Sequence, residues 1–362
     1  MNRAEPRAGA LRDQDHGVRH NRRMNRPTHR PSPAASPATD RQPTSYAPLI
    51  KEIGRGAKGS HPLSREQAEW LFGHILDGSV PPLELGAILL ALRMKSESLD
   101  ELLGFKAALD ARTAQLAAPT NAPRTVLLPT YNGARRQANL MPLLALLLAR
   151  HGVPVLIQGR HDFDSRVSPF ELLARLGIEP AADIASAEQQ LAGRHPACLR
   201  LETLCPGLAE LLALRPRLGL RNSGHTIAKL LDPCRGHSVR VVAVTHPEYL
   251  VRMDEVLQSE QANAMLLRGT EGEAYANPRR RPRLMGYRDG APALLAEAEE
   301  GGAPPLGTLP DLPDASSNAG LIREMLASRV PIPQPLIDQA AALLWLSGGS
   351  ASVDDGRARL TG

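Results

Sequence analysis

The stretch LSREQAEWLFGHILDGSVPPLELGAILLALRMKSESLDELLGFKAAL, residues 63–109, decides the fold of the first part of the chain. Ser64 and Ser98 each stand three residues before a glutamine or glutamate, which is the spacing of a helix capping box. Apolar residues recur at helical spacing after each cap, and a proline pair opens the nearly all-apolar segment between them. We therefore expect three short antiparallel helices in a small bundle over residues 46–118.

After residue 124 the pattern changes. Short apolar runs of strand length alternate with segments of helical spacing, which is typical of a largely parallel sheet covered on both faces. We expect an α/β protein with a small N-terminal helical domain and a larger α/β domain around a central, largely parallel sheet. Residues 289–318, rich in Gly, Pro, Ala and acids, are predicted to form a long loop before a last helix. The expected strands are TVLLP, VPVLIQG, ACLRLE, VRVVAVTH and AMLLRG.

The first 45 residues differ in composition from the rest of the chain. They hold nine arginines and four acidic residues, so they alone account for the net charge of +5 of the 362-residue chain. They lack apolar periodicity, and Met24 within them is an alternative start. We predict a disordered basic tail over 1–45 and a flexible C-terminus over 351–362. No secretory signal or membrane-length apolar run is visible, and the three cysteines lack metal-ligand spacing, so we expect a cytoplasmic protein.

The helical stretch resembles the N-terminal domain of the anthranilate phosphoribosyltransferase and class II nucleoside phosphorylase family (glycosyltransferase family 3). LLALRMKSES followed by ELLGF is the most specific part of the resemblance. It continues through LLARHGVPVLIQG, ELLARLGIEP and EYLVRMDEVLQSEQANAMLLRGTEGE, to about residue 290. The resemblance implies a helical domain over 46–118, hinged to an α/β domain over 119–350. It also implies a homodimer joined through the helical part.

The loop PTYNGAR, residues 129–135, stands where enzymes of this family have a glycine-rich loop that cradles pyrophosphate. Only bare backbone lets a phosphate come close, and Tyr131 and Arg135 would crowd that approach. The resemblance therefore implies that Tyr131, Asn132 and Gly133 form a vestigial phosphate loop.

The family's magnesium-binding Asp–Glu pair is also missing. In the best alignment Ala274 and Tyr275 occupy the two positions, and neither side chain offers magnesium a carboxylate oxygen. Glu271 and Glu273 lie nearby and are weak candidates for a metal site. Losing one transition-state contact costs on the order of 3 kcal/mol, so losing the cradle and the metal pair together predicts no catalytic residue and no cofactor.

Basic residues cluster around the positions where the family's substrate groove lies. The loop at 129–136 and the segments 160–166, 215–229 and 279–288 each contribute several. A solvated surface loop is the alternative interpretation of each cluster. Aromatic residues make up 3% of the chain, so we expect phosphate contacts to dominate over base stacking. The predicted nucleic-acid-binding residues are Arg135, Arg136, Arg160, His161, Arg221, Lys229, Arg279, Arg280, Arg281 and Arg283.

Three functions are compatible with these observations. The first is non-catalytic, largely sequence-independent binding of DNA or RNA, preferably single-stranded, by a homodimer. It is the function of the DNA-binding, YbiB-like branch of the family, which this chain resembles in YNGARRQANLMPLLALLLARHGVPVL and RGTEGE. The alternative is a phosphoribosyltransferase or phosphorylase of changed specificity, in which Glu271 and Glu273 would hold magnesium. A regulator that binds a nucleotide in the groove is a third possibility, supported by the scaffold alone.

Overall fold

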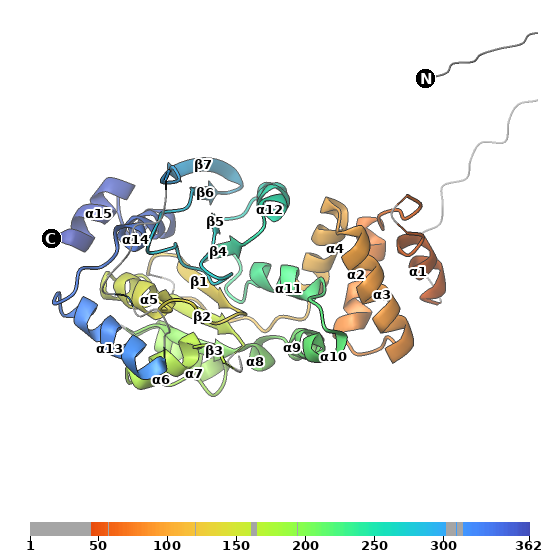
Figure 1. Cartoon of the computed structure of the whole chain (residues 1–362), viewed down its shortest axis with the longest axis horizontal. Coiled ribbons are helices and arrows are strands. Elements are labelled where there is room, and N and C mark those ends of the chain that lie inside the picture. Colours follow the sequence, from red (N-terminus) through yellow and green to blue (C-terminus); the bar gives the residue numbers. More distant parts are fainter. Residues whose placement is uncertain are drawn as a thin grey trace, which may run out of the picture. The chain divides into compact units, whose positions relative to one another are not determined.

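The computed structural model describes most of the chain after the N-terminal segment (Figure 1). The tail expected over 1–45 lies outside the described residues except for Ser45. None of the described helices is long and apolar enough to cross a membrane. The described residues are 45–56, 58–119, 121–160, 165–193, 195–301, 309 and 314–362.

The first part of the chain folds into a helical bundle, as predicted. Both capping boxes are present: the Ser64 and Ser98 hydroxyls accept from the amides of Gln67 and Glu101. The bundle contains one helix more than expected, because a short helix precedes the first cap. The helices are α1 (Ala47–Ile53), α2 (Arg65–Leu76), α3 (Pro82–Lys95) and α4 (Leu99–Asp110).

A seven-stranded sheet forms the centre of the larger α/β part, with strand order β3-β2-β1-β4-β5-β6-β7. The first five strands in the sequence pair in parallel and match the five predicted runs, whereas β6 and β7 add an antiparallel edge. β7 lies in the predicted long loop, so that prediction is wrong for this segment. The strands are β1 (Thr125–Thr130), β2 (Val155–Gly159), β3 (Ala197–Arg200), β4 (Ser238–Val244), β5 (Ala264–Arg268), β6 (Leu284–Arg288) and β7 (Ala291–Ala296).

Helices cover both faces of the sheet, and alternate side chains of each strand enter different cores. Val126 and Leu128 of β1 belong to the core formed with α5, α6, α13 and α14, whereas Leu127 belongs to the core shared with the helical bundle. The helices of this part are α5 (Met141–Arg150), α6 (Pro169–Arg175), α7 (Ile184–Leu191), α8 (Leu201–Leu204), α9 (Pro206–Ala213), α10 (Arg215–Leu218), α11 (Gly224–Ile227), η1 (Ala228–Leu230), α12 (Pro247–Ser259), α13 (Ala315–Leu326), α14 (Gln334–Ser347) and α15 (Val353–Thr361).

The C-terminus is a packed helix, which corrects the expectation of a flexible segment over 351–362. The Ser352 side chain caps α15 by accepting from the amide of Asp355. Arg357 of α15 then pairs with the buried Asp338 of α14 at 3.1 Å. The segment is mostly polar, so its helix depends on this cap and on tertiary contacts that composition does not reveal.

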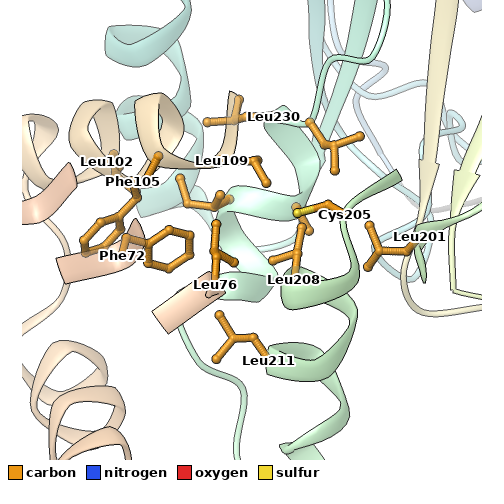
Figure 2. Close-up of a cluster of buried hydrophobic side chains, with 14 of the residues drawn as sticks. Phe72, Leu76, Leu102, Phe105, Leu109, Leu201, Cys205, Leu208, Leu211 and Leu230 are labelled. Atoms are coloured by element: carbon orange, nitrogen blue, oxygen red, sulfur yellow. The ribbon is translucent and has the colours of Figure 1, made fainter. Parts of the chain in front are cut away.

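The helical bundle and the α/β part share one hydrophobic core (Figure 2). The rings of Phe72 and Phe105 stack with their centroids 4.6 Å apart, and their cluster continues into Leu208 of α9. Gly207 lets α9 approach the end of α2, because a Cβ there would lie 1.8 Å from the carbonyl oxygen of Leu76. This close packing fixes the orientation of the bundle beside the sheet.

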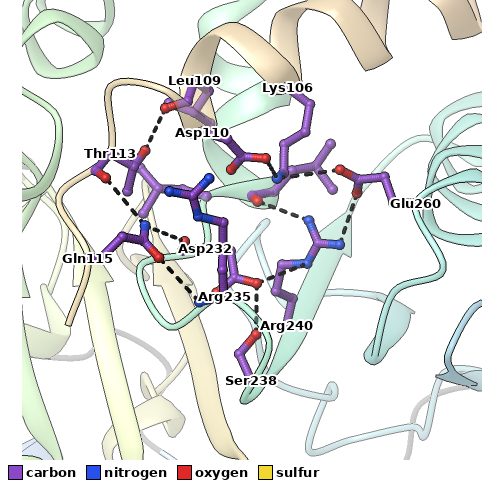
Figure 3. A network of polar contacts seen from close by, with 12 residues as sticks. Lys106, Leu109, Asp110, Thr113, Gln115, Asp232, Arg235, Ser238, Arg240 and Glu260 are labelled. Atoms are coloured by element: carbon purple, nitrogen blue, oxygen red, sulfur yellow. Dashed lines mark hydrogen bonds and ion pairs between the residues drawn. The ribbon is translucent and has the colours of Figure 1, made fainter. Parts of the chain in front are cut away.

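A buried ionic network joins the same two parts (Figure 3). Lys106 Nζ of α4 lies 2.5 Å from Asp110 Oδ2 and 3.4 Å from Glu260 Oε1. Glu260 in turn pairs with Arg240 of β4 at 2.9 Å between Oε2 and Nη2. Lys106 and Arg240 each pair with two acidic residues, so the network links α4 of the bundle to β4 and to the end of α12 through several ionic contacts.

Candidate anion-binding cleft

A cleft opens at the carboxyl ends of the parallel strands, beside the helical bundle. A hollow of about 330 Å³ is lined by Tyr131 and Asn132 after β1, by Arg160 after β2, and by Arg215 of α10. A second hollow of about 90 Å³ shares His225 with it. Ligands of open α/β sheets bind at this edge. We call the two hollows the arginine cleft, whose basic residues are Arg93, Arg160, Arg166, Arg215, Arg221 and Lys229.

Four arginines of this cleft, Arg93 among them, lack an ion-pair partner in the described part of the chain. Arg166, Arg215 and Arg221 form no ion pair with any acidic residue in the described ranges. Burial lowers the pKa of Arg221, and repulsion from Arg215 and Arg166 lowers it further. The pKa of Arg166 is lowered by burial and by Arg135. A bound anion would relieve this repulsion, which is the electrostatic property of an anion site.

Neutral oxygen atoms hold the two half-buried guanidinium groups in place. Arg166 Nη1 donates to the carbonyl oxygens of Asn132 and Gly133, each at 3.4 Å. Arg221 Nη2 donates to the side-chain oxygen of Asn132. These contacts orient the groups without an ion pair, and the more distant Glu271 and Glu273 offset the lowering of the Arg166 pKa only in part.

Two further titratable groups line the cleft. Lys229 donates to the carbonyl oxygen of Ala243, and burial, with a contribution from Arg221, lowers its pKa to about 8. Burial also lowers the pKa of His225 to about 3, with Arg221 and Arg215 adding to the effect. At neutral pH His225 is therefore uncharged, whereas Lys229 is mostly protonated and close to its titration range.

The loop after β1 holds a carboxyl group that the protein itself supplies. Glu273 is fully buried, and its Oε1 accepts from the backbone amides of Tyr131 at 3.2 Å, Asn132 at 2.9 Å and Gly133 at 3.1 Å. Its Oε2 accepts from the Thr130 hydroxyl at 2.6 Å. Burial raises the pKa of Glu273, and these hydrogen bonds oppose the rise.

Glu271 makes similar contacts one step further along the loop. Its carboxylate accepts from the amides of Arg135 at 3.2 Å and Arg136 at 2.9 Å. Tyr275, at an expected metal position, is buried and donates its hydroxyl to the carbonyl oxygen of Ala138 at 3.0 Å.

The residues at these positions do not fit the family's magnesium. The carboxylates of Glu271 and Glu273, the weak candidates from the sequence, already accept hydrogen bonds from the loop, and Ala274 offers no ligand atom. No cluster of three or more His, Cys, Asp or Glu residues able to hold a metal is found in the described part of the chain.

The arginine run predicted at 279–283 lies outside the lining of the arginine cleft and has acidic neighbours. Arg281 pairs with the buried Asp338 and lies 3.7 Å from Glu299. Arg283 lies 3.9 Å from Glu297. Arg280 donates to the carbonyl oxygen of Gly301, and the half-buried Arg279 donates its backbone amide to Asn277.

The structure therefore gathers only some of the predicted binding residues. Arg160, Arg221 and Lys229 line the cleft, Arg135 and Arg136 are exposed on the adjoining loop, and His161 lies outside the described residues. Arg166 and Arg215 belong to the expected basic segments, although they are absent from the predicted binding set. Arg93 of α3 was missed, because only the packing of the bundle against the sheet brings it to the cleft.

Comparison with known proteins agrees with this architecture. Residues 47–113 match the family described as glycosyl transferase family, helical bundle domain. YbiB of Escherichia coli (strain K12) is 40% identical over 317 residues, which cover 87% of this chain and 98% of YbiB. Anthranilate phosphoribosyltransferase of Beijerinckia indica subsp. indica is 27% identical over 304 residues, covering 83% of this chain and 87% of that enzyme. Anthranilate phosphoribosyltransferase (TrpD) from Thermus thermophilus shares the fold, with a TM-score of 0.69, 23% identity and coverage of 86% of this chain and 92% of that one.

The fold, the helical bundle and these relatives define the class: the chain belongs to the anthranilate phosphoribosyltransferase-like family, glycosyltransferase family 3. Within that family it belongs to the branch of YbiB. The family and fold predicted from the sequence are confirmed, and the binding of DNA or RNA stays a prediction.

Proposed function

We propose that this protein binds nucleic acid without catalysis, through the arginine cleft, with little dependence on base sequence. The observation that carries the proposal is that Arg166, Arg215 and Arg221 have no acidic partner among the described residues, at the sheet edge where the family binds its substrates. A polyphosphate backbone supplies many evenly spaced anions, and guanidinium groups bind such oxygens in bidentate fashion. The ligand is DNA or RNA, preferably single-stranded, because a flexible strand fits a cleft of this volume better than a duplex does.

A homodimer joined through the helical bundle completes the proposal. Leu83, Ala87, Leu90 and Met94 follow one face of α3, and three of them are strongly exposed: Leu83 at 82%, Leu90 at 50% and Met94 at 78%. Such an apolar stripe on a surface helix favours a protein partner. A second copy would place two clefts on one particle, and tethering two weak sites raises the overall affinity.

The proposal is tested with a fluorescent single-stranded oligonucleotide and protein lacking residues 1–45. We expect binding at low salt that weakens steeply as salt is added. No binding at low salt, or binding that requires the basic tail, would contradict the proposal. Sedimentation of a Leu90→Glu/Met94→Glu variant tests the dimer, which we expect to dissociate.

Membership of an enzyme family favours a second candidate, a transferase of changed specificity. Calorimetry with phosphoribosyl pyrophosphate and magnesium separates the two functions. Heat of binding that a chelator abolishes supports the enzyme, whereas its absence together with oligonucleotide binding supports the proposal.

A further inference from the structure

We infer that Glu273 is a built-in anion that occupies the phosphate loop and excludes small diphosphates, so that it sets the class of ligand this cleft accepts. The exclusion follows from the loop alone, and its consequence for phosphodiester ligands rests on the proposed function.

The contacts of Glu273 are those of a bound anion. Three consecutive amides, from Tyr131 to Gly133, point at one carboxylate oxygen, and the Thr130 hydroxyl donates to the other. Gly133 has a positive φ of 62°, so the loop curls into a concave row of N–H groups. Such a nest is a general anion-binding device, and here a buried side chain fills it.

The turn at residues 270–273 places the Glu273 side chain in the phosphate loop. Thr270 and Glu273 form an antiparallel bridge, and Gly272 between them has a φ of +90°. A Cβ on Gly272 would lie 2.5 Å from Nδ2 of Asn132, so a larger residue would collide with the loop. Asn132 in turn donates to the carbonyl oxygen of Gly272 at 3.2 Å. The turn is therefore fitted closely against the side chain of Asn132 in the loop.

Filling the nest also changes what the loop presents to the cleft. With its amides directed at Glu273, the loop offers oxygen atoms of Asn132 and Gly133 to Arg166 and Arg221. A ligand entering the cleft meets guanidinium groups in place of amides. Separated guanidinium groups suit phosphates spaced along a chain, whereas a compact diphosphate requires the row of amides.

The experiment uses inorganic pyrophosphate as the probe and the full-length protein, with Glu273→Ala compared with Glu273→Gln. The alanine variant empties the nest, whereas glutamine retains the volume and an acceptor oxygen. We expect Glu273→Ala to bind pyrophosphate about tenfold or more tightly than the wild type, since charge-assisted hydrogen bonds to three amides become available. Glu273→Gln should match the wild type. NMR should show pyrophosphate shifting the amide resonances of residues 131–133 in the alanine variant alone.

Equal pyrophosphate affinity of folded Glu273→Ala and wild type would overturn the inference. If the alanine variant does not fold, the wild type decides: amide shifts at residues 131–133 on adding pyrophosphate would overturn the inference, and unchanged resonances would support it. Oligonucleotide titrations run in parallel keep the two proposals apart. A wild type that binds no oligonucleotide contradicts the proposed function. The pyrophosphate experiment still tests whether Glu273 excludes diphosphates from the loop.

Discussion

The arginine cleft and the arginine run at 279–283 are both rich in arginine, but they differ in the acidic residues that lie beside those arginines. In the cleft, Arg166, Arg215 and Arg221 lack acidic partners among the described residues, and burial and mutual repulsion lower the pKa of Arg166 and Arg221. In the run, Arg281 is paired with Asp338, and Arg283 has Glu297 nearby. The absence of ion-paired carboxylates distinguishes a candidate anion site from a structural cluster of arginines. The number of arginines in a sequence segment does not show this difference.

The largest effect should come from reversing charge in the cleft. Arg166→Glu/Arg221→Glu should weaken oligonucleotide binding by roughly a hundredfold, because two phosphate contacts become repulsions in a partly desolvated site. Fluorescence anisotropy at low salt measures the loss. Arg280→Glu/Arg283→Glu is the matched control, for which we expect a much smaller loss of affinity. An equal loss in both variants would show that the run contributes to binding as much as the cleft does.

Removing a paired arginine from the run should affect folding more than binding. Arg281→Ala leaves the buried Asp338 with Arg357 as its remaining ionic partner among the residues described. We expect the free energy of unfolding to fall by about 2 kcal/mol, less than for a fully isolated buried charge. Chemical denaturation measures this, with Arg283→Ala as a control that changes stability by less than about 0.5 kcal/mol. If Arg281→Ala is as stable as the wild type, the pair is not structural.

Salt dependence gives a finer test of the cleft. If about six phosphates are neutralised on a single strand, log K should fall with log salt at a slope near −4. Arg215→Ala, which removes an exposed arginine of the cleft, should reduce the magnitude of the slope by about 0.7. The same titration with Arg280→Ala should leave the slope unchanged, and a loss there would show that the run contacts the ligand.

The smallest effect concerns Lys229, whose pKa is lowered to about 8. As pH rises through this value the side chain loses its charge, so oligonucleotide affinity should decline a few-fold between pH 7 and pH 9. Lys229→Met should show a flatter profile. Unfolding exposes a lysine with its ordinary pKa of 10.5, which binds more protons between about pH 8 and 10.5. Relative to Lys229→Met, the stability of the wild type should therefore rise with pH in that window, because the buried cysteines that also titrate there are common to both proteins. A difference in stability that does not change with pH would contradict the lowered pKa.

The parts of the fold that depend on local sequence signals were predictable. Neighbouring residues alone indicate the helix caps at Ser64 and Ser98 and the five parallel strands. The structure contains all of them. β7 and α15 were missed because an exposed edge strand and a polar terminal helix are stabilised by partners distant in the sequence.

The candidate site was predictable only in part, for the same reason. The sequence indicates that the pyrophosphate loop has changed. It suggests only a weak metal-binding role for Glu273, because the residues that Glu273 contacts, 130–133, lie some 140 positions earlier in the chain. Arg93 gives no signal either, since a basic residue in the last turn of a helix is common. Ion pairs such as Arg281 with Asp338 likewise become visible only when the chain is folded.

The most direct test of the account compares both regions in one wild-type sample. Arginines are labelled with phenylglyoxal in the presence and absence of saturating single-stranded oligonucleotide, and protection is measured at each position by mass spectrometry. We predict protection of the exposed Arg215 and of Arg166 and Arg221 in the cleft, and unchanged labelling of the exposed Arg280 and Arg283. Protection at Arg280 and Arg283 with none in the cleft would contradict the account.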